Sequence, residues 1–336
     1  MFVALIKKVV ENINLSVNES SFAMDFIMKG EATPSQIASF ITALRMKGET
    51  IDEITGFAKK MREHAIQIHP HKTNLVDTCG TGGDALGTFN ISTVSAFVAA
   101  GAGVTVAKHG NRSVSSKCGS ADLLCALGVN INIEPQKVKE CIDKIGIGFI
   151  FAPVFHKAMR FAMPSRKEIG IRTVFNILGP LTNPANASAQ ILGVFDSRLC
   201  EVMAKVLRNL GVQHALVVHG NDGLDEISIT DKTRISQLRK GKINNYEIKP
   251  KDFGIKKALL KDLFSDTVLN NKKIALNILK GKEIGPKRDV ILLNSAAAIF
   301  VGGIAKDMHE GINLAKESID SGLAYKKLCE LIAFTT

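Results

Sequence analysis

The 336-residue sequence has no tryptophan, only two tyrosines, and six cysteines that form no CxxC pair. No histidine–cysteine cluster has the spacing of a zinc site, so we expect reduced thiols and no structural zinc. No apolar run reaches the roughly 18 residues needed to span a bilayer. The N-terminus also lacks the basic-then-apolar order and the cleavage site of a signal peptide. These absences predict a cytoplasmic protein with no membrane contact.

Acidic residues are absent between Asp84 and Asp122, and every formal charge in that stretch is positive. The same region reads Asp-Thr-Cys-Gly-Thr-Gly-Gly-Asp at 77–84, Phe-Asn-Ile-Ser-Thr at 89–93 and Lys-His-Gly-Asn-Arg at 108–112. Glycines let backbone N–H groups approach a ligand closely, and successive N–H groups form a nest for an anion. The stretch therefore predicts a site for a heavily phosphorylated small molecule.

The glycine turn also has other interpretations. The turn beginning at Gly80 loosely fits the dinucleotide fingerprint, which needs an acidic residue about 20 positions on, whereas the next acid after Asp84 is Asp122. A Walker loop is excluded because no Lys-Ser or Lys-Thr follows the glycines at the right spacing. A tight turn without a ligand stays an alternative, as does a role for Asn90, Ser92 and Thr93 as helix caps alone.

The formal net charge of +11 raises the possibility of nucleic-acid binding. The basic residues are scattered, however, and their clusters are only pairs such as Lys256-Lys257. Blocks of five or six like charges, which indicate an interaction tail, are absent. We therefore expect a solvated basic surface and no nucleic-acid partner, with a weak polyanion affinity as the alternative.

The fold class expected from the pattern is α/β, with a small N-terminal all-helical domain. Residues 1–70 carry apolar residues at helical spacing, with Ser16, Thr33-Pro34 and Thr50 placed to start successive helices. From 71 to 336 strands alternate with helices, which predicts a larger domain whose largely parallel central sheet is covered by helices. Part of the turn-rich run 160–185 is expected to join the helical domain.

Ligands of such sheets bind at the carboxyl ends of the strands. The pattern predicts a strand over 104–107 that ends before Lys108, so that Lys108 to Arg112 form a basic turn at that edge. Asn90 or Ser92 is expected to cap the helix before this strand, and Ser120 the helix after it. A purely structural role stays an alternative for His109.

A magnesium site is a further hypothesis. Asp225 and Glu226 are adjacent acids after a glycine-containing loop. Such pairs are usually solvated, but beside a phosphate site they suit Mg²⁺, which takes one or two carboxylates together with phosphate oxygens. The Ser92 hydroxyl is a further oxygen ligand for the same ion. His69 and His71 have no neighbours to complete a ligand set and are expected to face solvent.

Five motifs in order resemble those of the anthranilate phosphoribosyltransferases: Gly-Thr-Gly-Gly-Asp, Asn-Ile-Ser-Thr, Lys-His-Gly-Asn-Arg, the run from Arg172 to Pro184, and Asp-Gly-Leu-Asp-Glu. The resemblance extends to 30–33 and 47–50 and so covers nearly the whole chain. It implies that the amine of anthranilate attacks C1 of 5-phosphoribosyl 1-pyrophosphate (PRPP) and that pyrophosphate leaves, in tryptophan biosynthesis. It implies no covalent intermediate and no acid–base residue.

The resemblance also implies site residues, two Mg²⁺ ions and a homodimer formed through the helical domain. The residues implied to bind PRPP are Gly80, Gly83, Asp84, Thr88, Asn90, Ile91, Ser92, Thr93, Lys108, Asn111 and Ser120. Those implied to bind anthranilate are Gly80, Asn111, His156 and Arg166. Those implied to bind Mg²⁺ are Ser92, Asp225 and Glu226. Ser165 departs from the family pattern, in which a small apolar residue precedes the arginine.

Two alternatives remain open at this point. Pyrimidine nucleoside phosphorylases resemble this family in fold, but different residues are expected around their phosphate turn and no Asp-Gly-Leu-Asp-Glu loop. A nucleic-acid-binding paralogue of the same fold suits the positive charge. Its sequence is expected to have lost Arg166, Asp225 and Glu226, all of which are present here.

Overall fold

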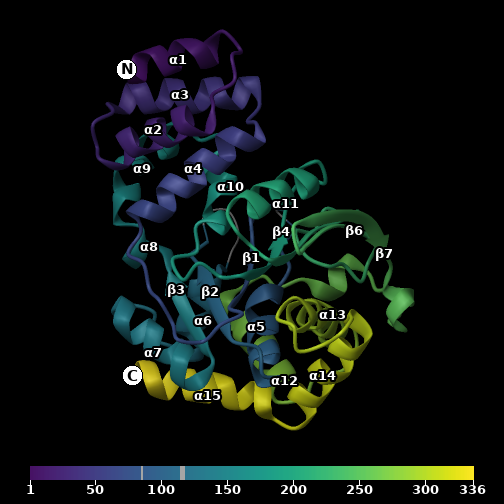
Figure 1. Ribbon diagram of the computed structural model, residues 1–336. Coiled ribbons are helices and arrows are strands. Elements are labelled where there is room, and N and C mark those ends of the chain that lie inside the picture. Colours follow the sequence, from purple (N-terminus) through teal and green to yellow (C-terminus); the bar gives the residue numbers. More distant parts are fainter. Residues whose placement is uncertain (85, 114–117) are drawn as a thin grey trace.

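The computed structural model describes residues 1–84, 86–113 and 118–336. An N-terminal helical bundle, at the top of Figure 1, stands on a larger α/β part. The bundle helices are α1 (Phe2–Val10), α2 (Val17–Met28), α3 (Pro34–Lys47) and α4 (Ile51–His64). The predicted starts are confirmed, because the side chains of Ser16, Thr33 and Thr50 each accept a hydrogen bond from the backbone N–H three residues on.

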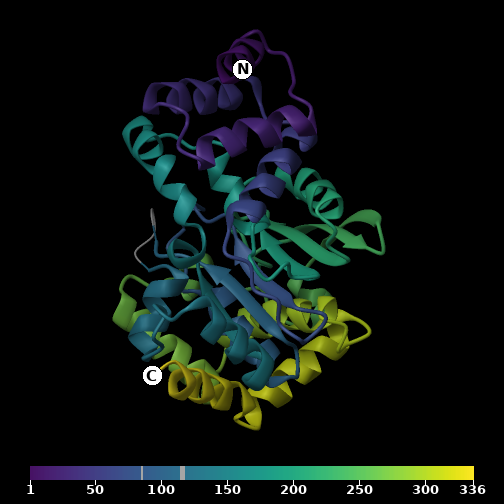
Figure 2. The same ribbon diagram turned by 60° about the vertical axis from the view of Figure 1, so that its left-hand side comes forward.

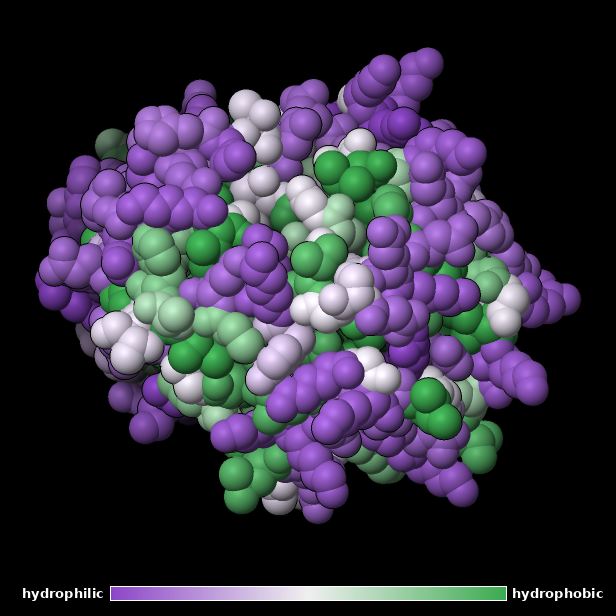
Figure 3. Space-filling view, turned by 90° about the horizontal axis from the view of Figure 1, so that it is seen from below, coloured by the Kyte–Doolittle hydropathy of each residue, from purple (hydrophilic) through white to green (hydrophobic). Residues whose placement is uncertain are grey.

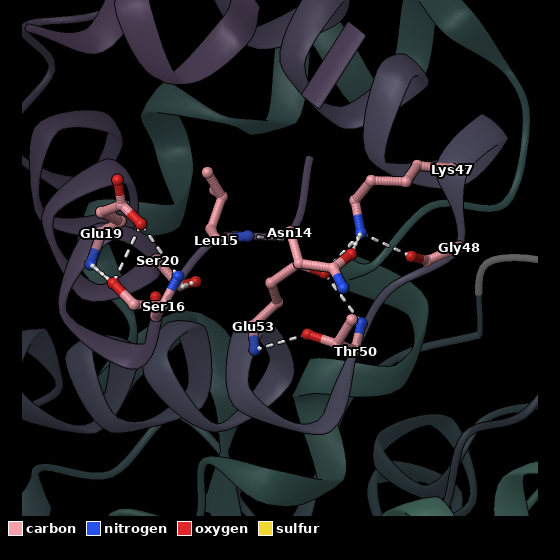
Figure 4. Close-up of polar contacts among 9 residues, drawn as sticks. All are labelled: Asn14, Leu15, Ser16, Glu19, Ser20, Lys47, Gly48, Thr50 and Glu53. Atoms are coloured by element: carbon pink, nitrogen blue, oxygen red, sulfur yellow. Dashed lines mark hydrogen bonds and ion pairs between the residues drawn. The ribbon is translucent and has the colours of Figure 1, made fainter. Parts of the chain in front are cut away.

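A buried ion pair holds two turns of the bundle together (Figure 4). Lys47 Nζ lies 2.9 Å from Glu53 Oε2, and the two side chains are 4% and 0% exposed. Glu53 also accepts hydrogen bonds from the backbone N–H groups of Leu15 and Thr50, while Lys47 donates to Asn14 Oδ1. A single charged pair thus joins the α1–α2 connection to the α3–α4 turn.

A seven-stranded sheet in the order β3-β2-β1-β4-β5-β6-β7 forms the centre of the α/β part. Five strands are parallel, as predicted, and β6 and β7 add an antiparallel hairpin at one edge. The order reverses direction at β1, between β2 and β4, and such switch points open a crevice for ligands. The strands are β1 (Val76–Gly80), β2 (Val106–Gly110), β3 (Ile147–Phe151), β4 (Ala189–Gly193), β5 (His214–Gly220), β6 (Thr233–Arg239) and β7 (Lys242–Ile248).

Helices cover both faces of the sheet (Figures 1 and 2). Side chains such as Ile191 and Val218 pack with α5 and α13 on one face, whereas Leu192 and Val217 pack with α11 and α4 on the other. This alternation follows from the two-residue period of a strand. The covering helices are α5 (Ile91–Gly101), α6 (Ser120–Leu127), α7 (Pro135–Ile145), α11 (Leu199–Asn209), α12 (Val268–Leu279), α13 (Pro286–Val301), α14 (Met308–Asp320) and α15 (Leu323–Thr335).

A run of short helices connects β3 to β4 and lies against the bundle. Its members are α8 (Ala152–Phe155), α9 (Met163–Ile169) and α10 (Phe175–Leu178), with 3₁₀ turns at Lys157–Phe161 and Gly179–Leu181. Ser165 in α9 is buried, and its hydroxyl donates a 2.9 Å hydrogen bond to the carbonyl of Pro34 in α3. The residue that departs from the family pattern therefore ties α9 to the bundle. Two further 3₁₀ turns lie at Pro250–Phe253 and Leu260–Leu263.

Three local predictions were wrong. Strand β2 runs from Val106 to Gly110, so Lys108 and His109 lie in the strand and not in a turn. The reason is the partner strand, since β3 pairs with β2 as far as Gly110. Asn90 stands at the N-cap of α5 without a side-chain capping bond, and Ser92 lies inside the helix. Gly119, and not Ser120, stands at the N-cap of α6.

The face seen from below in Figure 3 is hydrophilic around its rim, with hydrophilic and apolar residues interleaved across its middle. Both linker histidines, His69 and His71, are exposed as predicted. Within the described ranges no helix has the length and apolarity needed to cross a membrane.

Candidate active site

The glycine turn after β1 meets the loop after β5 at the carboxyl edge of the sheet. The backbone N–H of Gly82 donates a 2.9 Å hydrogen bond to Asp225 Oδ2. A Cβ at Gly80 would lie 2.6 Å from that same oxygen, and one at Gly193 would lie 1.5 Å from the Asp225 carbonyl. Glycines at the ends of β1 and β4 therefore allow the acidic loop to reach the turn, and Gly83 has the positive φ that favours glycine.

Three carboxyl groups gather here without enough positive charge to balance them. Burial, followed by the charge of Asp84, raises the pKa of Asp225 to about 7. Burial, followed by the charge of Asp225, raises the pKa of Glu226 to about 8. Glu226 Oε1 accepts a 3.1 Å hydrogen bond from the backbone N–H of Ser92. Crowded carboxylates of this kind favour a cation, because a cation stabilises their charged forms.

The chemistry of the donor set decides whether magnesium fits. In the described part of the chain no three His, Cys, Asp or Glu side chains form a metal-binding group. Mg²⁺ does not need three, since it is usually held by one or two carboxylates together with phosphate oxygens and water. Asp225 and Glu226, with the hydroxyl of Ser92, fit an ion shared with a phosphorylated ligand.

Lys108, in strand β2, lies next to this cluster. Its side chain is buried, and Nζ donates to the carbonyl of Thr78. The same nitrogen lies 3.4 Å from Ser92 Oγ. Burial lowers the pKa of Lys108, while the charge of buried Asp77 acts in the opposite direction. A cation is thus placed below the start of α5.

The N-terminus of α5 presents donors and unpaired polar atoms. Asn90 Nδ2 donates to the carbonyl of Cys118, and the Asn90 backbone N–H donates to Asn271 Oδ1. Asn90 Oδ1 and Thr93 Oγ1 are buried and have no hydrogen-bond partner among the described residues. Thr88 pairs with Phe264 in an isolated bridge just before the helix. A helix N-terminus suits a phosphate group.

Asn111 and Ser120 are brought together across the loop that follows β2. Ser120 Oγ donates a 3.2 Å hydrogen bond to the carbonyl of Asn111. Asp122 fastens this loop, because it accepts from Arg112 Nη1 and from the backbone N–H groups of Ser113 and Gly119. The sequence argument missed this role of Asp122, although its position three residues after Gly119 is the spacing of a capping box.

Two buried histidines face one another on the other side of β2. The ring centres of His109 and His156 lie 5.1 Å apart. The backbone N–H of His109 donates a 3.0 Å hydrogen bond to Asp77 Oδ1. Within the described residues neither Nε2 atom has a partner. Burial lowers the pKa of His156 to about 4 and holds the pKa of His109 well below its usual value, so both rings are neutral near pH 7.

The guanidinium of Arg166, in α9, contacts an aromatic ring and a sulfur atom. Its guanidinium carbon lies 5.1 Å from the ring centre of Phe175, and Nη1 contacts Met163 Sδ at 3.6 Å. Among the described residues no carboxylate pairs with Arg166, and burial lowers its pKa. A partly buried guanidinium without an acidic partner suits a bidentate carboxylate from a ligand. No contact joins Arg166 directly to the carboxylate cluster in the described structure.

Three residues that the sequence argument did not select support the site. Asp77 is buried and accepts hydrogen bonds from the backbone N–H of His109 and from Asn183 Nδ2. Arg172 donates to the carbonyl of Gly83 and stacks 4.5 Å over the ring of Phe195. An acid inside an otherwise apolar strand was the available signal for Asp77. For Arg172 and Asn183 the signal was their place in the motif that runs from Arg172 to Pro184.

Two family models match the chain. The model described as the glycosyl transferase family, a/b domain, covers residues 72–325, and the one described as its helical bundle domain covers residues 3–65. The chain is 58% identical over 330 residues to an anthranilate phosphoribosyltransferase of Acetivibrio thermocellus, covering 98% of this chain and 95% of that protein.

Two solved structures superpose closely on this chain. The crystal structure of anthranilate phosphoribosyltransferase from Thermus thermophilus superposes with a TM-score of 0.94 at 43% identity, covering 98% of this chain and 99% of that one. The enzyme from Saccharomyces cerevisiae, in complex with PRPP and Mg, superposes with a TM-score of 0.91 at 29% identity, covering 99% and 97%.

Proposed function

The chain belongs to the anthranilate phosphoribosyltransferase family, and on that premise we propose that it transfers the phosphoribosyl group of PRPP to the amine of anthranilate. The products are N-(5-phosphoribosyl)anthranilate and pyrophosphate, in tryptophan biosynthesis. Two hydrogen bonds carry this assignment: Asp225 accepts one from the glycine turn, and Glu226 accepts one from the start of α5. The cluster that they join combines a phosphate nest with oxygen ligands for a metal ion.

The pyrophosphate and ribose are assigned to the glycine turn, the start of α5 and the loop after β2. The backbone donors of the turn and of the helix N-terminus suit phosphate oxygens. Lys108 adds a buried positive charge close to Ser92. The unpaired Asn90 Oδ1 and Thr93 Oγ1 supply polar atoms for the ligand. The residues assigned to PRPP are Gly80, Gly83, Asp84, Thr88, Asn90, Ile91, Ser92, Thr93, Lys108, Asn111 and Ser120.

Asp225, Glu226 and Ser92 are the proposed ligands of magnesium, with two ions in the loaded enzyme. Bound Mg²⁺ supplies electrostatic stabilisation of the negative charge that gathers on the departing pyrophosphate. The raised pKa values of Asp225 and Glu226 support this assignment, because they reflect carboxyl groups that are buried and lie beside other acids. The relative from Saccharomyces cerevisiae, whose structure holds PRPP and Mg, supports it as well.

Anthranilate is assigned to the side that carries Arg166 and the histidine pair. Arg166 would pair with the carboxylate of the substrate, and Gly80, Asn111 and His156 would complete the pocket. Because His109 and His156 stay neutral, they place no second positive charge beside the amine. An aromatic amine is already nucleophilic when neutral, so no covalent or acid–base residue is assigned.

During the transfer the bond between C1 and the pyrophosphate oxygen breaks as the bond between C1 and the amine nitrogen forms. The nitrogen then loses one of its two protons, which the departing pyrophosphate takes up. The ribosyl carbon becomes more positive while the leaving group becomes more negative. Hydrogen-bond donors of the protein that already point at the leaving group lower the activation barrier, because they need not reorganise during the reaction. Lys108 and the N-terminus of α5 are placed for that role, and the acidic loop contacts both the glycine turn and the start of α5.

The assembly, the division of the chain and its location are also proposals. We assign residues 1–70, with part of 160–185, to the helical domain and residues 71–336 to the α/β domain. A homodimer through the helical domain is supported by exposed apolar side chains on the bundle, since such patches mark interaction sites: Met1, Val3, Val10, Ile13 and Met46. A cytoplasmic location is supported by cysteines that stand outside any disulfide: Cys79, Cys125, Cys141, Cys200 and Cys329.

Anthranilate fluorescence tests the function. With Mg²⁺ and PRPP the purified protein should consume that fluorescence, and omission of either PRPP or Mg²⁺ should stop the loss. The variant Lys47→Arg, which keeps the charge within the bundle, is a control far from the transfer site. Persistent fluorescence in the complete mixture, with a correctly folded protein, would reject the assignment.

A further inference from the structure

Arg62 in the last turn of α4 contacts two backbone carbonyls of the α/β part. Its Nε donates to the carbonyl of Leu181 at 2.7 Å, and its Nη1 lies 3.3 Å from the carbonyl of Leu210. No carboxylate in the described ranges forms an ion pair with it. Burial lowers the pKa of Arg62 to about 10. A buried guanidinium is costly, and here its compensation comes from main-chain carbonyls.

The segment 179–183, which Arg62 holds at Leu181, also contacts the carboxyl edge of the sheet. At that edge Asp77 Oδ1 accepts a 3.0 Å hydrogen bond from the backbone N–H of His109. Asn183 donates to Asp77 Oδ2 at 2.9 Å and to the carbonyl of Ala107 at 2.8 Å. One short segment therefore lies between α4 on one side and strands β1 and β2 on the other.

We propose that Arg62 is a positioning residue for the acceptor half of the site. By holding the Leu181 carbonyl, it fixes segment 179–183, whose Asn183 holds Asp77 and through it the backbone of His109, beside the ring pair of His109 and His156. The inference rests on the proposed function, because it takes the molecule beside those rings to be anthranilate. Arg62 itself does not touch the rings or the substrate. It acts from the helical bundle through segment 179–183.

Electrostatics agree with this placement. Burial lowers the pKa of Arg62, and the charge of Asp77 partly opposes that lowering. Burial also lowers the pKa of His109, and the charge of Arg62 adds to that lowering. Arg62, Asp77 and His109 are therefore close enough to influence one another. Two hydrogen bonds from one rigid guanidinium fix the direction of a backbone segment, which an apolar side chain of similar size cannot do.

Three variants separate positioning from stability. Arg62→Met removes both hydrogen bonds, and Arg62→Lys keeps the charge but has no planar fork. Asn209→Ala is the matched control, because Asn209 Nδ2 also joins α11 to α4, at Thr55 Oγ1, without touching segment 179–183. We expect Arg62→Met to raise the KM for anthranilate about tenfold and to leave the KM for PRPP within about twofold. Arg62→Lys should fall between it and the unchanged protein, and Asn209→Ala should leave both KM values unchanged.

A second readout needs no substrate. The ¹⁵N signals of the His109 and His156 rings in the ligand-free protein should shift in Arg62→Met and Arg62→Lys, and should stay in place in Asn209→Ala. If Arg62→Met does not fold, Arg62→Lys carries the same test. Unshifted ring signals, or equal changes in the two KM values, would overturn the proposal. A protein that never consumes anthranilate would reject the proposed function instead, and the ring signals would still decide the role of Arg62.

Discussion

The backbone N–H of Ser92 donates a 3.1 Å hydrogen bond to Oε1 of Glu226, although 134 positions separate the two residues in the sequence. The bond joins the start of α5 to the loop after β5. Asp225, the preceding residue, reaches the glycine turn through Gly82. One dipeptide therefore holds the two elements that we propose to bind phosphate in a fixed relation, so displacement of this loop should disturb both.

The close approach of β4 to the acidic loop gives the first prediction. In Gly193→Ala the new Cβ would lie 1.5 Å from the Asp225 carbonyl, so the loop must move. Because a misplacement of about 1 Å can cost about 10²-fold in rate, we expect kcat/KM for PRPP to fall by about that factor. The Mg²⁺ concentration needed for half-maximal activity should rise as well. Steady-state kinetics with a Mg²⁺ titration measures both quantities.

Ser188→Ala is the control for this variant. Ser188 lies just before β4, at the end of the strand away from Asp225. This variant should retain the kinetics of the unchanged protein. Normal PRPP kinetics in folded Gly193→Ala would show that the acidic loop tolerates displacement.

The unpaired guanidinium of Arg166 gives the second prediction. Removing one partner of a charged hydrogen-bonded pair costs about 2–5 kcal/mol. Arg166→Ala should therefore weaken the use of anthranilate by at least about 30-fold, with little change in PRPP binding. Calorimetric titration with PRPP and steady-state kinetics with varied anthranilate separate the two effects. Arg160→Ala, which removes a guanidinium that stacks on Phe161 in the same segment, should preserve both. Equal losses for the two substrates would remove the carboxylate role from Arg166.

The buried ion pair of the helical bundle gives the third prediction. Lys47→Met leaves the Glu53 carboxylate fully buried without its cation. Breaking a buried pair by removing one partner costs about 3–5 kcal/mol. Urea unfolding should show a loss of that size. Lys60→Met, which breaks a more exposed pair with Glu63, should cost at most about 1 kcal/mol. Equal losses for the two variants would mean that burial does not strengthen the Lys47–Glu53 pair.

What the sequence could predict depended on how local the determining contact is. The starts of α2, α3 and α4 are set by side chains three residues from the groups they cap, and these predictions are confirmed. The predicted cap at Asn90 failed because its amide donates to the carbonyl of Cys118, 28 positions away. The predicted end of β2 was wrong for a related reason, since the length of β2 is set by its pairing with β3.

The same limit applies to the candidate site. Motifs indicated which residue types belong together, and the structure brings Ser92, Lys108 and Glu226 into one cluster. The link between Asp77 and Asn183 spans 106 positions and follows no periodicity. Such a pair is found only when the fold is known, because nothing near either residue indicates its partner.

The buried His156 ring gives a prediction about pH. Its pKa falls from the usual 6.5 to about 4 in the folded protein. Between these two values the unfolded chain binds a proton that the folded chain does not, so stability decreases as the pH falls. The contribution is fully present above pH 6.5 and is lost by about pH 4. At about 1.4 kcal/mol per pKa unit, the loss is about 3 kcal/mol. His109, whose pKa is also lowered, adds a loss of the same sign.

His156→Gln isolates the contribution of one ring. Urea unfolding at a series of pH values from 7 to 4 should give a shallower decline for this variant than for the unchanged protein, whatever the difference in their stability at pH 7. His71→Gln is the control, because His71 is exposed in the linker, and its curve should run parallel to that of the unchanged protein. A parallel curve for His156→Gln would show that the His156 ring takes up its proton at the same pH in the folded and unfolded chains. The proposal that a neutral histidine pair lies beside the acceptor site would then be rejected, because burial would not be keeping His156 uncharged.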